Sequence, residues 1–335
     1  MQSCEVKKIE ACYLEYRKAC YNILYKHAEQ KGVLKLLHND GKTFEAISQD
    51  LAVLPKRKQA LELFLRALVK IGAVAFDETT SRYKKKQDFT EGNLQLNRED
   101  IAVAIGNEQA EKLIHADSYR GIVDTFSQEE NPVAADFINK NIALWDEFLQ
   151  QPFYTFGRRL AAEKISKING TVLDLACGPG FGLLELGELV GPQGQVVGVD
   201  FSNDFAQIAL ERVKQQPNIR VFQADIDGGL GFLRDEYFDG AAMIGAYHFL
   251  KRKDIFFGNV ARVLKKGGRL CIGYAFMNRN TYDQEIMNLR MLLREPPAAP
   301  VDPEWLLNQA DQAGLEFISD EGSIGSFGWY LFEKR

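Results

Sequence analysis

At 335 residues, the chain is too long for one hydrophobic core of typical size and suits two domains, or one large domain with a helical partner. Its composition, with 46% hydrophobic and 26% charged residues, is that of a folded globular protein and excludes extensive disorder. The net charge of −5 excludes a field that attracts nucleic acid or an anionic membrane. No apolar run is long enough to span a bilayer, and Met1–Lys8 lacks the apolar stretch of a signal peptide, so we expect a cytoplasmic protein.

The cysteines predict reduced thiols. Their number, five, is odd, and no two have the C-x-x-C spacing of a metal or redox motif. Cys4, Cys12 and Cys20 are eight residues apart on a predicted helix. Successive cysteines are therefore offset by about 80° around the helix axis, so they do not line up as ligands. The sequence therefore predicts neither a disulfide framework nor a metal site.

Residues 1–110 predict a helical N-terminal domain. Apolar residues recur at helical spacing over 1–30, and a strongly apolar helix is predicted over 56–70. Two short strands, 73–76 and 81–84, follow around a polar turn. Helices followed by a two-stranded wing are typical of a winged helix.

Residues 111–169 predict a helical linker that is rich in aromatic side chains, with a break at Asn131–Pro132. Ordinary helix packing explains most of these aromatic residues. Four arginines are weak candidates for a clamp on an acidic ligand, and a surface position is the simpler interpretation of each: Arg158, Arg159, Arg279 and Arg290.

Residues 170–335 alternate between strands and helices, which predicts an α/β fold with a mostly parallel seven-stranded sheet. The last two strands are joined by a loop too short for a helical crossover, so the last strand must be antiparallel. Residues 275–302 contain three prolines and are interpreted as an insertion after the fifth strand. The predicted strands are 171–175, 195–200, 219–224, 238–244, 269–274, 315–319 and 327–332.

A glycine-rich turn follows the first of these strands and leads into a helix that begins near Phe181. Glycine permits a tight turn and a close approach of ligand to backbone, and the helix N-terminus favours an anionic group. A nicotinamide or flavin dinucleotide would also suit such a turn. However, the dinucleotide fingerprint G-x-G-x-x-G, counted from Gly178, requires glycine at Leu183.

The turn resembles the first motif of class I methyltransferases that use S-adenosylmethionine (SAM), D-x-G-x-G-x-G. Asp174, Gly178 and Gly180 match the motif, and Ala176 stands where the family usually has glycine. We expect the turn to tolerate alanine there if the φ angle of Ala176 stays negative. The resemblance implies that these four residues bind SAM in a Rossmann-like methyltransferase sheet.

Two further strand ends carry residues that suit a nucleoside. Asp200 ends the second strand, where a carboxylate accepts hydrogen bonds from a ribose diol, and Phe201 follows as a ring to pack on adenine. The third strand ends at Asp225 and Ile226, which resemble the family's adenine-recognition step. The segment Val260–Leu270 resembles the family's R-V-L-K-P-G-G-R-L motif, so the resemblance extends over 170–335.

His248 follows the fourth strand, at the place where related O-methyltransferases carry a histidine as general base. Those enzymes have His-x-Trp-x-Asp, whereas this chain has His248-Phe249-Leu250-Lys251-Arg252, so a pocket or structural histidine stays open as the alternative. Tyr247, Phe153 and Tyr154 are further candidates to contact the methyl acceptor.

The N-terminal half is similar to the winged-helix domain that dimerises small-molecule O-methyltransferases and caps their substrate. This resemblance implies a homodimer that methylates a small molecule, with a hydroxyl oxygen as the expected acceptor. Sulfur, carbon or nitrogen acceptors stay open, as does a SAM-binding regulator with a degenerate site. We expect neither nucleic acid nor membrane as a partner, because the helix over 56–70 is too apolar to read a DNA groove.

Overall fold

The computed structural model describes residues 3–105, 121–129, 142–276, 280–293 and 301–335. The chain forms two compact units, one of residues 1–140 and 279–300 and the other of residues 141–278 and 301–335. The domain boundaries at 110 and 169 stay predictions. Parts of the predicted linker, 111–120 and 130–141, and the clamp candidate Arg279 lie outside the described residues.

The first unit is mainly helical and contains a three-stranded antiparallel sheet in the order β1-β3-β2. The helix predicted over 56–70 is α4, and the two predicted strands are β2 and β3, each displaced by one residue from its expected position. The elements of this unit are α1 (Ser3–Gln30), α2 (Val33–Leu36), β1 (Lys42–Thr43), α3 (Phe44–Asp50), η1 (Pro55–Arg57), α4 (Lys58–Lys70), β2 (Val74–Asp77), β3 (Arg82–Lys85), η2 (Glu91–Leu94), α5 (Arg98–Ile105), α7 (Ile122–Thr125) and α14 (Gln284–Leu292).

The insertion predicted after the fifth strand supplies α14 to this first unit. α14 packs on α4, and the segment before it contacts α1, where the Tyr21 hydroxyl donates to the carbonyl of Tyr282 at 2.7 Å. Leu61, Phe64 and Leu68 of α4 are fully buried. The apolar surface of α4 is therefore covered within its own unit, and the homodimer stays a prediction.

The second unit contains the seven-stranded sheet, in the order β6-β5-β4-β7-β8-β10-β9. All neighbouring pairs from β6 to β8 are parallel, and β10 is antiparallel to both β8 and β9, which confirms the predicted fold class. The elements are α9 (Ile142–Leu149), α10 (Pro152–Ile165), β4 (Thr171–Leu175), α11 (Phe181–Val190), β5 (Gln195–Asp200), α12 (Asn203–Val213), β6 (Ile219–Gln223), η4 (Ile226–Gly228), β7 (Phe238–Ile244), η5 (Tyr247–Phe249), α13 (Lys253–Val263), β8 (Leu264–Ala275), α15 (Pro303–Gln312), β9 (Leu315–Ile324) and β10 (Phe327–Lys334).

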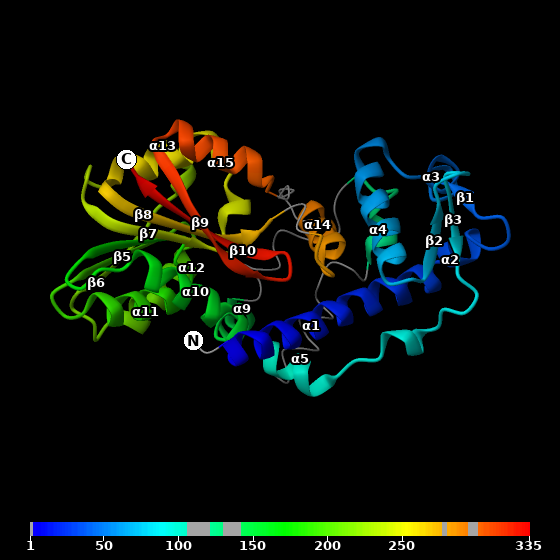
Figure 1. Ribbon diagram of the computed structural model, residues 1–335, viewed down its shortest axis with the longest axis horizontal. Coiled ribbons are helices and arrows are strands. Elements are labelled where there is room, and N and C mark those ends of the chain that lie inside the picture. The colour runs from blue at the N-terminus through cyan, green and yellow to red at the C-terminus, as the bar shows by residue number, and fades with distance from the viewer. Residues whose placement is uncertain (1–2, 106–120, 130–141, 277–279, 294–300) are drawn as a thin grey trace. The chain divides into compact units, whose positions relative to one another are not determined.

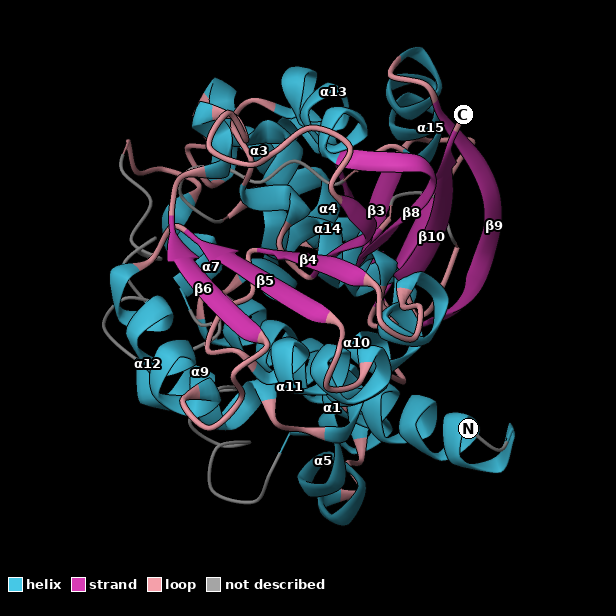
Figure 2. Cartoon of the chain, turned by 90° about the vertical axis from the view of Figure 1, so that its left-hand side faces the viewer, coloured by secondary structure: helices cyan, strands magenta, loops and turns pink. Residues whose placement is uncertain are grey.

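Helices cover both faces of this sheet, with α10, α11 and α12 on one face and α13 and α15 on the other (Figures 1 and 2). The central strand β4 is apolar on both sides, and Val172, Leu173 and Leu175 are fully buried, as a parallel strand between two helical layers requires. The sheet order reverses direction between β4 and β7. Ligands of such sheets bind at the carboxyl ends of the strands beside this switch point.

The last hairpin is longer than predicted. β9 continues to Ile324 and β10 begins at Phe327, so only Gly325 and Ser326 form the turn. Gly325 has a φ of 57°, a left-handed conformation that two-residue hairpin turns favour. The polarity of 320–323 suggested a loop, but an edge strand such as β9 carries polar residues because one face of it meets solvent.

Candidate functional site

The turn after β4 has left-handed backbone at three alternate residues. The φ angles of Ala176, Gly178 and Gly180 are 58°, 54° and 88°. Our expectation of a negative φ at Ala176 is therefore wrong, since this alanine adopts the conformation that glycine adopts more readily. A left-handed alanine costs about 1–2 kcal/mol, so the surrounding structure holds the turn in a strained shape.

Asp174 lies on β4 directly beneath this turn and is buried, at 7% exposure. Its Oδ2 would lie 2.6 Å from a Cβ atom on Gly182, so a larger residue at that position of α11 would displace the Asp174 carboxylate. Burial raises the pKa of Asp174 to about 7; the Arg158 guanidinium opposes this rise, and Glu185 and Asp200 add to it. A cationic ligand group beside Asp174, such as the ammonium of an amino acid, would therefore stabilise the ionised carboxylate.

Asp200 at the end of β5 organises the turn through backbone hydrogen bonds. Its Oδ2 accepts from the amide of Gly178 at 2.8 Å, and its Oδ1 accepts from the amide of Ser202 at 2.9 Å. Burial raises the pKa of Asp200, and the backbone donors counteract part of that rise. Two backbone bonds leave further lone pairs on this carboxylate, which suits the two hydroxyls of a ribose.

The predicted nucleoside residues lie at the ends of neighbouring strands. The Phe201 ring, which follows β5, is 66% exposed, an unusual state for a phenyl ring and one that leaves a face open for stacking. Asp225 follows β6 and is exposed, with Oδ1 accepting from the amide of Asp227 at 2.9 Å, while Ile226 is buried beside it. Because β6, β5 and β4 are adjacent in the sheet, the structure brings all predicted SAM-binding residues to one edge.

The predicted base, His248, lies in η5 after β7 and is buried among aromatic rings. Its ring stacks on Tyr274 of β8, with centroids 4.9 Å apart and planes at 26°, and its other neighbour, Phe249, lies at 3.8 Å. Tyr247 is fully buried against Phe256 of α13 rather than at the surface of this cluster. The imidazole is thus fixed in orientation by ring stacking.

The other predicted acceptor contacts, Phe153 and Tyr154, begin α10 and join a second aromatic cluster. Tyr154 contacts Phe148 of α9 at 4.9 Å, and Phe153 contacts Phe327 of β10 at 5.5 Å, both edge to face. These contacts connect α9 and α10 with the last strand. Sequence spacing did not predict them, because the rings come from segments far apart in the chain.

Sequence analysis missed the charged network around the turn. Arg158, a weak clamp candidate from the sequence, is mostly buried and donates to Glu185 of α11 at 3.2 Å and to the carbonyl of Leu149 at 2.7 Å. Arg212 of α12 binds Asp146 of α9. No local sequence motif marks such ion pairs. The sequence predicted only that these arginines and carboxylates lie on helices, and not which of them pair. Of the other clamp candidates, Arg290 is buried in the first unit and Arg159 is exposed.

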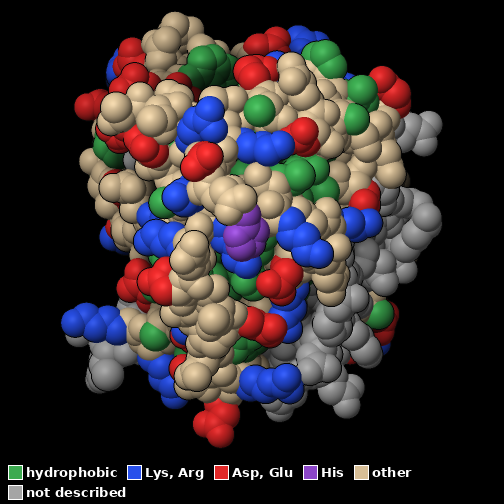
Figure 3. Space-filling view, turned by 90° about the vertical axis from the view of Figure 1, so that its right-hand side faces the viewer, with side chains coloured by type: hydrophobic (Ala, Val, Ile, Leu, Met, Phe, Trp, Pro, Cys, Tyr) green, Lys and Arg blue, Asp and Glu red, His purple; other side chains and the backbone are tan. Residues whose placement is uncertain are grey.

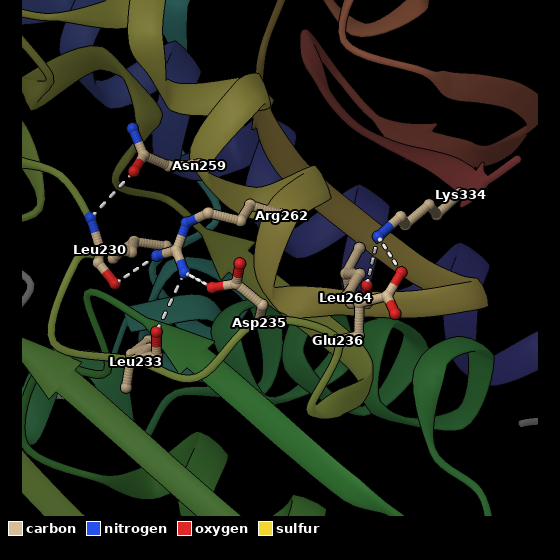
Figure 4. Close-up of polar contacts among 8 residues, drawn as sticks. All are labelled: Leu230, Leu233, Asp235, Glu236, Asn259, Arg262, Leu264 and Lys334. Atoms are coloured by element: carbon tan, nitrogen blue, oxygen red, sulfur yellow. Dashed lines mark hydrogen bonds and ion pairs between the residues drawn. The ribbon is translucent and has the colours of Figure 1, made fainter.

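The segment Val260–Leu270, which resembled a family motif, has a structural role here. The Arg262 guanidinium donates to the carbonyls of Leu230 and Leu233 and to the carboxylate of Asp235 (Figure 4). Asn259 accepts from the amide of Leu230 at 3.1 Å. Together these bonds fasten the chain between η4 and β7 to α13, downstream of the residues predicted to recognise adenine.

Within the described residues, no three or more His, Cys, Asp or Glu side chains are grouped in a way that would hold a metal ion. Among the helices that the structure describes, none combines the length and hydrophobicity needed to cross a membrane.

Comparisons with known proteins agree with this geometry. Residues 172–268 match the model of a methyltransferase domain. Over 152 residues the chain is 31% identical to the ubiquinone/menaquinone biosynthesis C-methyltransferase UbiE of Pseudomonas putida, an alignment that covers 44% of this chain and 59% of that relative. The chain spans between 55% and 59% of the length of the first curated relatives it matches.

Solved structures resemble the chain over nearly its whole length. The carbon methyltransferase DszA has a TM-score of 0.67 at 14% identity, over 100% of this chain and 94% of that one. The mitomycin 7-O-methyltransferase MmcR has a TM-score of 0.52 at 15% identity, over 95% and 94%. The fold is that of class I methyltransferases. Residues 172–268 form a SAM-dependent methyltransferase domain, as the motifs predicted.

Proposed function

We propose that this protein transfers the methyl group of SAM to a small-molecule acceptor. The observation that carries the proposal is the edge formed by β4, β5 and β6. There the strained turn and the buried Asp174 lie beside Asp200, which accepts two backbone hydrogen bonds. The solvent-exposed ring of Phe201 follows Asp200. This donor set matches an amino acid at one end of a ligand and a nucleoside at the other.

We further propose carbon as the acceptor atom, in place of the oxygen expected from the sequence. Two structures titled carbon methyltransferases, CurJ and DszA, resemble the chain over both units, with TM-scores of 0.64 and 0.67. The O-methyltransferase MmcR resembles it less, at 0.52. The absence of the His-x-Trp-x-Asp pattern after β7 also favours carbon. Oxygen stays the second candidate, because MmcR still matches over 95% of this chain.

When bound, SAM supplies an electrophilic methyl group on a sulfonium sulfur. In this proposal Asp174 holds the ammonium, Asp200 the ribose and Asp225 the adenine amine, which fixes the direction in which the methyl group points. Alignment of two reactants can supply about 7–11 kcal/mol of a barrier, so this positioning is the main contribution of the chain. The aromatic rings near His248 and α9 exclude water from the reacting atoms.

The acceptor must lose a proton when it gains the methyl group. An imidazole nitrogen of His248 takes that proton, the new bond forms on the acceptor, and the electron pair of the broken bond stays on sulfur. A carbon flanked by carbonyl groups loses its proton more easily than an alkane carbon does, so such an acceptor suits a single histidine. No covalent intermediate with the protein is needed.

The experiment that tests this function follows methyl transfer directly. Purified protein is incubated with SAM carrying a labelled methyl group and a metabolite extract, and mass spectrometry locates the label in the product. Label on a ring or chain carbon supports the proposal, and label on oxygen supports the second candidate. Binding of SAM without any labelled product would instead indicate a regulator, and tighter binding of NAD than of SAM would contradict the cofactor.

For the N-terminal unit we propose a winged-helix-like domain that forms a homodimer and does not bind nucleic acid. The lysines that begin the apolar helix are engaged with acidic residues, Lys56 with Glu129 at 2.6 Å and Lys58 with Glu45 at 2.8 Å. The face drawn in Figure 3 shows basic side chains interspersed with acidic ones rather than gathered in a patch. Light scattering tests the dimer, and a monomer at micromolar concentration would contradict it.

A further inference from the structure

Arg212 joins three parts of the SAM-binding unit. It lies in the last turn of α12, and its guanidinium binds both carboxylate oxygens of Asp146 on α9, each at 2.9 Å. The same guanidinium donates to the carbonyl of Pro179 within the glycine turn. Its carbon atom Cζ lies 3.8 Å above the ring of Phe181, the first residue of α11. One side chain therefore touches the turn, the helix that follows the turn, and α9.

α9 lies against the same turn at a second place. The carbonyl of Leu149, its last residue, accepts from Arg158 at 2.7 Å. The side chain of Leu149 reaches Gly178, where its Cδ1 would lie 4.0 Å from an added Cβ. Trp145 and Phe148 of α9 are buried. This helix consequently covers the turn that the proposed function assigns to the methionine end of SAM.

The Arg212–Asp146 pair differs from an ordinary surface ion pair. Its two side chains are 18% and 21% exposed, whereas those of the neighbouring Lys214–Glu211 pair at the end of α12 are 56% and 71% exposed. Exposed pairs are screened by water and salt and contribute little. In the Arg212–Asp146 pair one guanidinium nitrogen, Nη2, donates to both carboxylate oxygens, and breaking such a mostly buried charge pair costs more than breaking an exposed one. The structure thus offers a matched control on the same helix.

We infer that Arg212 is a positioning residue of the cofactor site, which fastens α9 over the glycine turn so that SAM enters and leaves when the Arg212–Asp146 pair opens. This inference rests on the proposed function only in naming SAM as the ligand beneath α9. Asp146→Asn removes the charge that holds α9 and leaves the bond from Arg212 to Pro179 in place. Arg212→Gln removes both links, and Arg212→Lys keeps the charge but lacks the two separate nitrogens that reach Asp146 and Pro179.

The experiment measures the dissociation rate of SAM by stopped-flow displacement, together with hydrogen exchange of the α9 amides in ligand-free protein. We expect Asp146→Asn to release SAM about tenfold faster than the wild type, and Arg212→Gln to release it faster still. Arg212→Lys should lie between Arg212→Gln and the wild type. Glu211→Gln, the control, should leave the rate unchanged. In the wild type, higher salt should accelerate release, whereas Asp146→Asn should lose most of that salt dependence.

The two readouts separate the possible failures. A wild type that does not bind SAM contradicts the proposed function, and the hydrogen exchange of α9 then still tests the link itself. Unchanged SAM release and unchanged α9 exchange in Asp146→Asn would overturn the inference. If Arg212→Gln fails to fold, Asp146→Asn and Arg212→Lys decide the question, because each keeps a side chain of similar size at its position.

Discussion

At the carboxyl ends of β4, β5 and β6 the site consists of carboxylates and left-handed backbone, whereas after β7 and β8 it consists of aromatic rings. On the first side, Asp200 holds the turn through the amide of Gly178, so backbone and side chain define one shape. On the second, His248 is held by stacking on Tyr274, and between β7 and η5 a single residue, Gly245, has left-handed backbone. The first side is thus fixed by hydrogen bonds to specific backbone groups, and the second by the packing of aromatic rings.

The largest effect is expected at His248, the polar group among the rings. His248→Ala should lower kcat by about 10²–10⁴-fold with little change in SAM affinity, because a general base acts on the acceptor and not on the cofactor. Methylation rates and calorimetric SAM binding measure the two properties, and His38→Ala, an exposed histidine of the first unit, is the control. A loss of less than tenfold would assign His248 a structural role. The acceptor side would then work without a general base.

The second prediction concerns the burial of Asp174. Its pKa is about 7 in the folded chain, above the ordinary aspartate value of about 4, so the folded state binds the proton more tightly than the unfolded state. The contribution of Asp174 to stability is therefore complete below about pH 4, decreases as the pH rises to 7, and is lost above it. Asp174→Asn avoids this loss, so without SAM it should be more stable than the wild type at pH 8, by up to about 4 kcal/mol.

Urea unfolding at pH 5 and pH 8 measures this difference, which should shrink toward pH 5. The same variant should bind SAM more weakly, since the ammonium loses its carboxylate. Asp204→Asn, an exposed residue of α12, is the control for loss of one charge. If the wild type and Asp174→Asn differ in stability by the same amount at both pH values, Asp174 titrates at its ordinary value. The carboxylate side of the site would then be less enclosed than the structure indicates.

A smaller effect is expected at Asp200. Asp200→Ala should weaken SAM binding by about 1.5–3 kcal/mol, the range for a lost charge-assisted hydrogen bond. Asp200→Asn retains one acceptor oxygen for the amides of Gly178 or Ser202 and should lose less. Calorimetry with SAM and with its demethylated product gives both values. Unchanged affinity in the alanine variant would remove Asp200 from the cofactor site and leave it only its role in the turn.

On the aromatic side, Tyr247→Phe should change little. The Tyr247 hydroxyl is buried and has no hydrogen-bond partner within the described residues, and burial raises the pKa of this phenol. Removing an unsatisfied hydroxyl should leave stability equal or raise it by about 1 kcal/mol, with kcat kept. Thermal unfolding and turnover measure the outcome. A clear loss of kcat would show that the hydroxyl contacts the acceptor, as the sequence predicted for this residue.

The smallest effect belongs to Ala176. Glycine relieves a left-handed strain of about 1–2 kcal/mol but adds freedom to the unfolded chain, so Ala176→Gly should gain about 0.5–1 kcal/mol. Ala176→Val, with a branched Cβ in the same backbone, should lose stability. Denaturant midpoints decide the sign. A loss in the glycine variant would mean that the methyl group of Ala176 packs in the site and is not merely tolerated there.

The contrast between the two sides also explains what the sequence predicted. The residues of the cofactor side follow strand ends at fixed spacing, because the turn and the adjacent carboxylates permit few residue types; Asp174, Gly178 and Asp200 could be found this way. The seven strands were likewise predicted from the alternation of strands and helices, and the antiparallel last strand from the short loop before it. The rings around His248 and Phe153 come from distant segments, and an aromatic residue has the same appearance in a sequence whether it fills a core or faces a ligand.

Conformation within the turn was beyond such reasoning too. The sign of φ at Ala176 depends on how Asp200 and α11 hold the backbone, which no single-residue preference reports. The pairing of Arg212 with Asp146 requires α12 and α9 to meet, and only the folded chain brings them together.

The order in which the chain is synthesised gives α14 a further consequence. This helix packs on α4 in the first unit, yet it is encoded after β8, the fifth strand of the sheet. A growing chain that has just completed residues 1–140 therefore carries the apolar face of α4 without its cover. Domains usually fold as units in the order in which they emerge, but here the N-terminal unit must wait until residue 292 has left the ribosome. The two units are consequently completed almost together, and a truncation after residue 169 would leave an unfinished fragment rather than an independent domain.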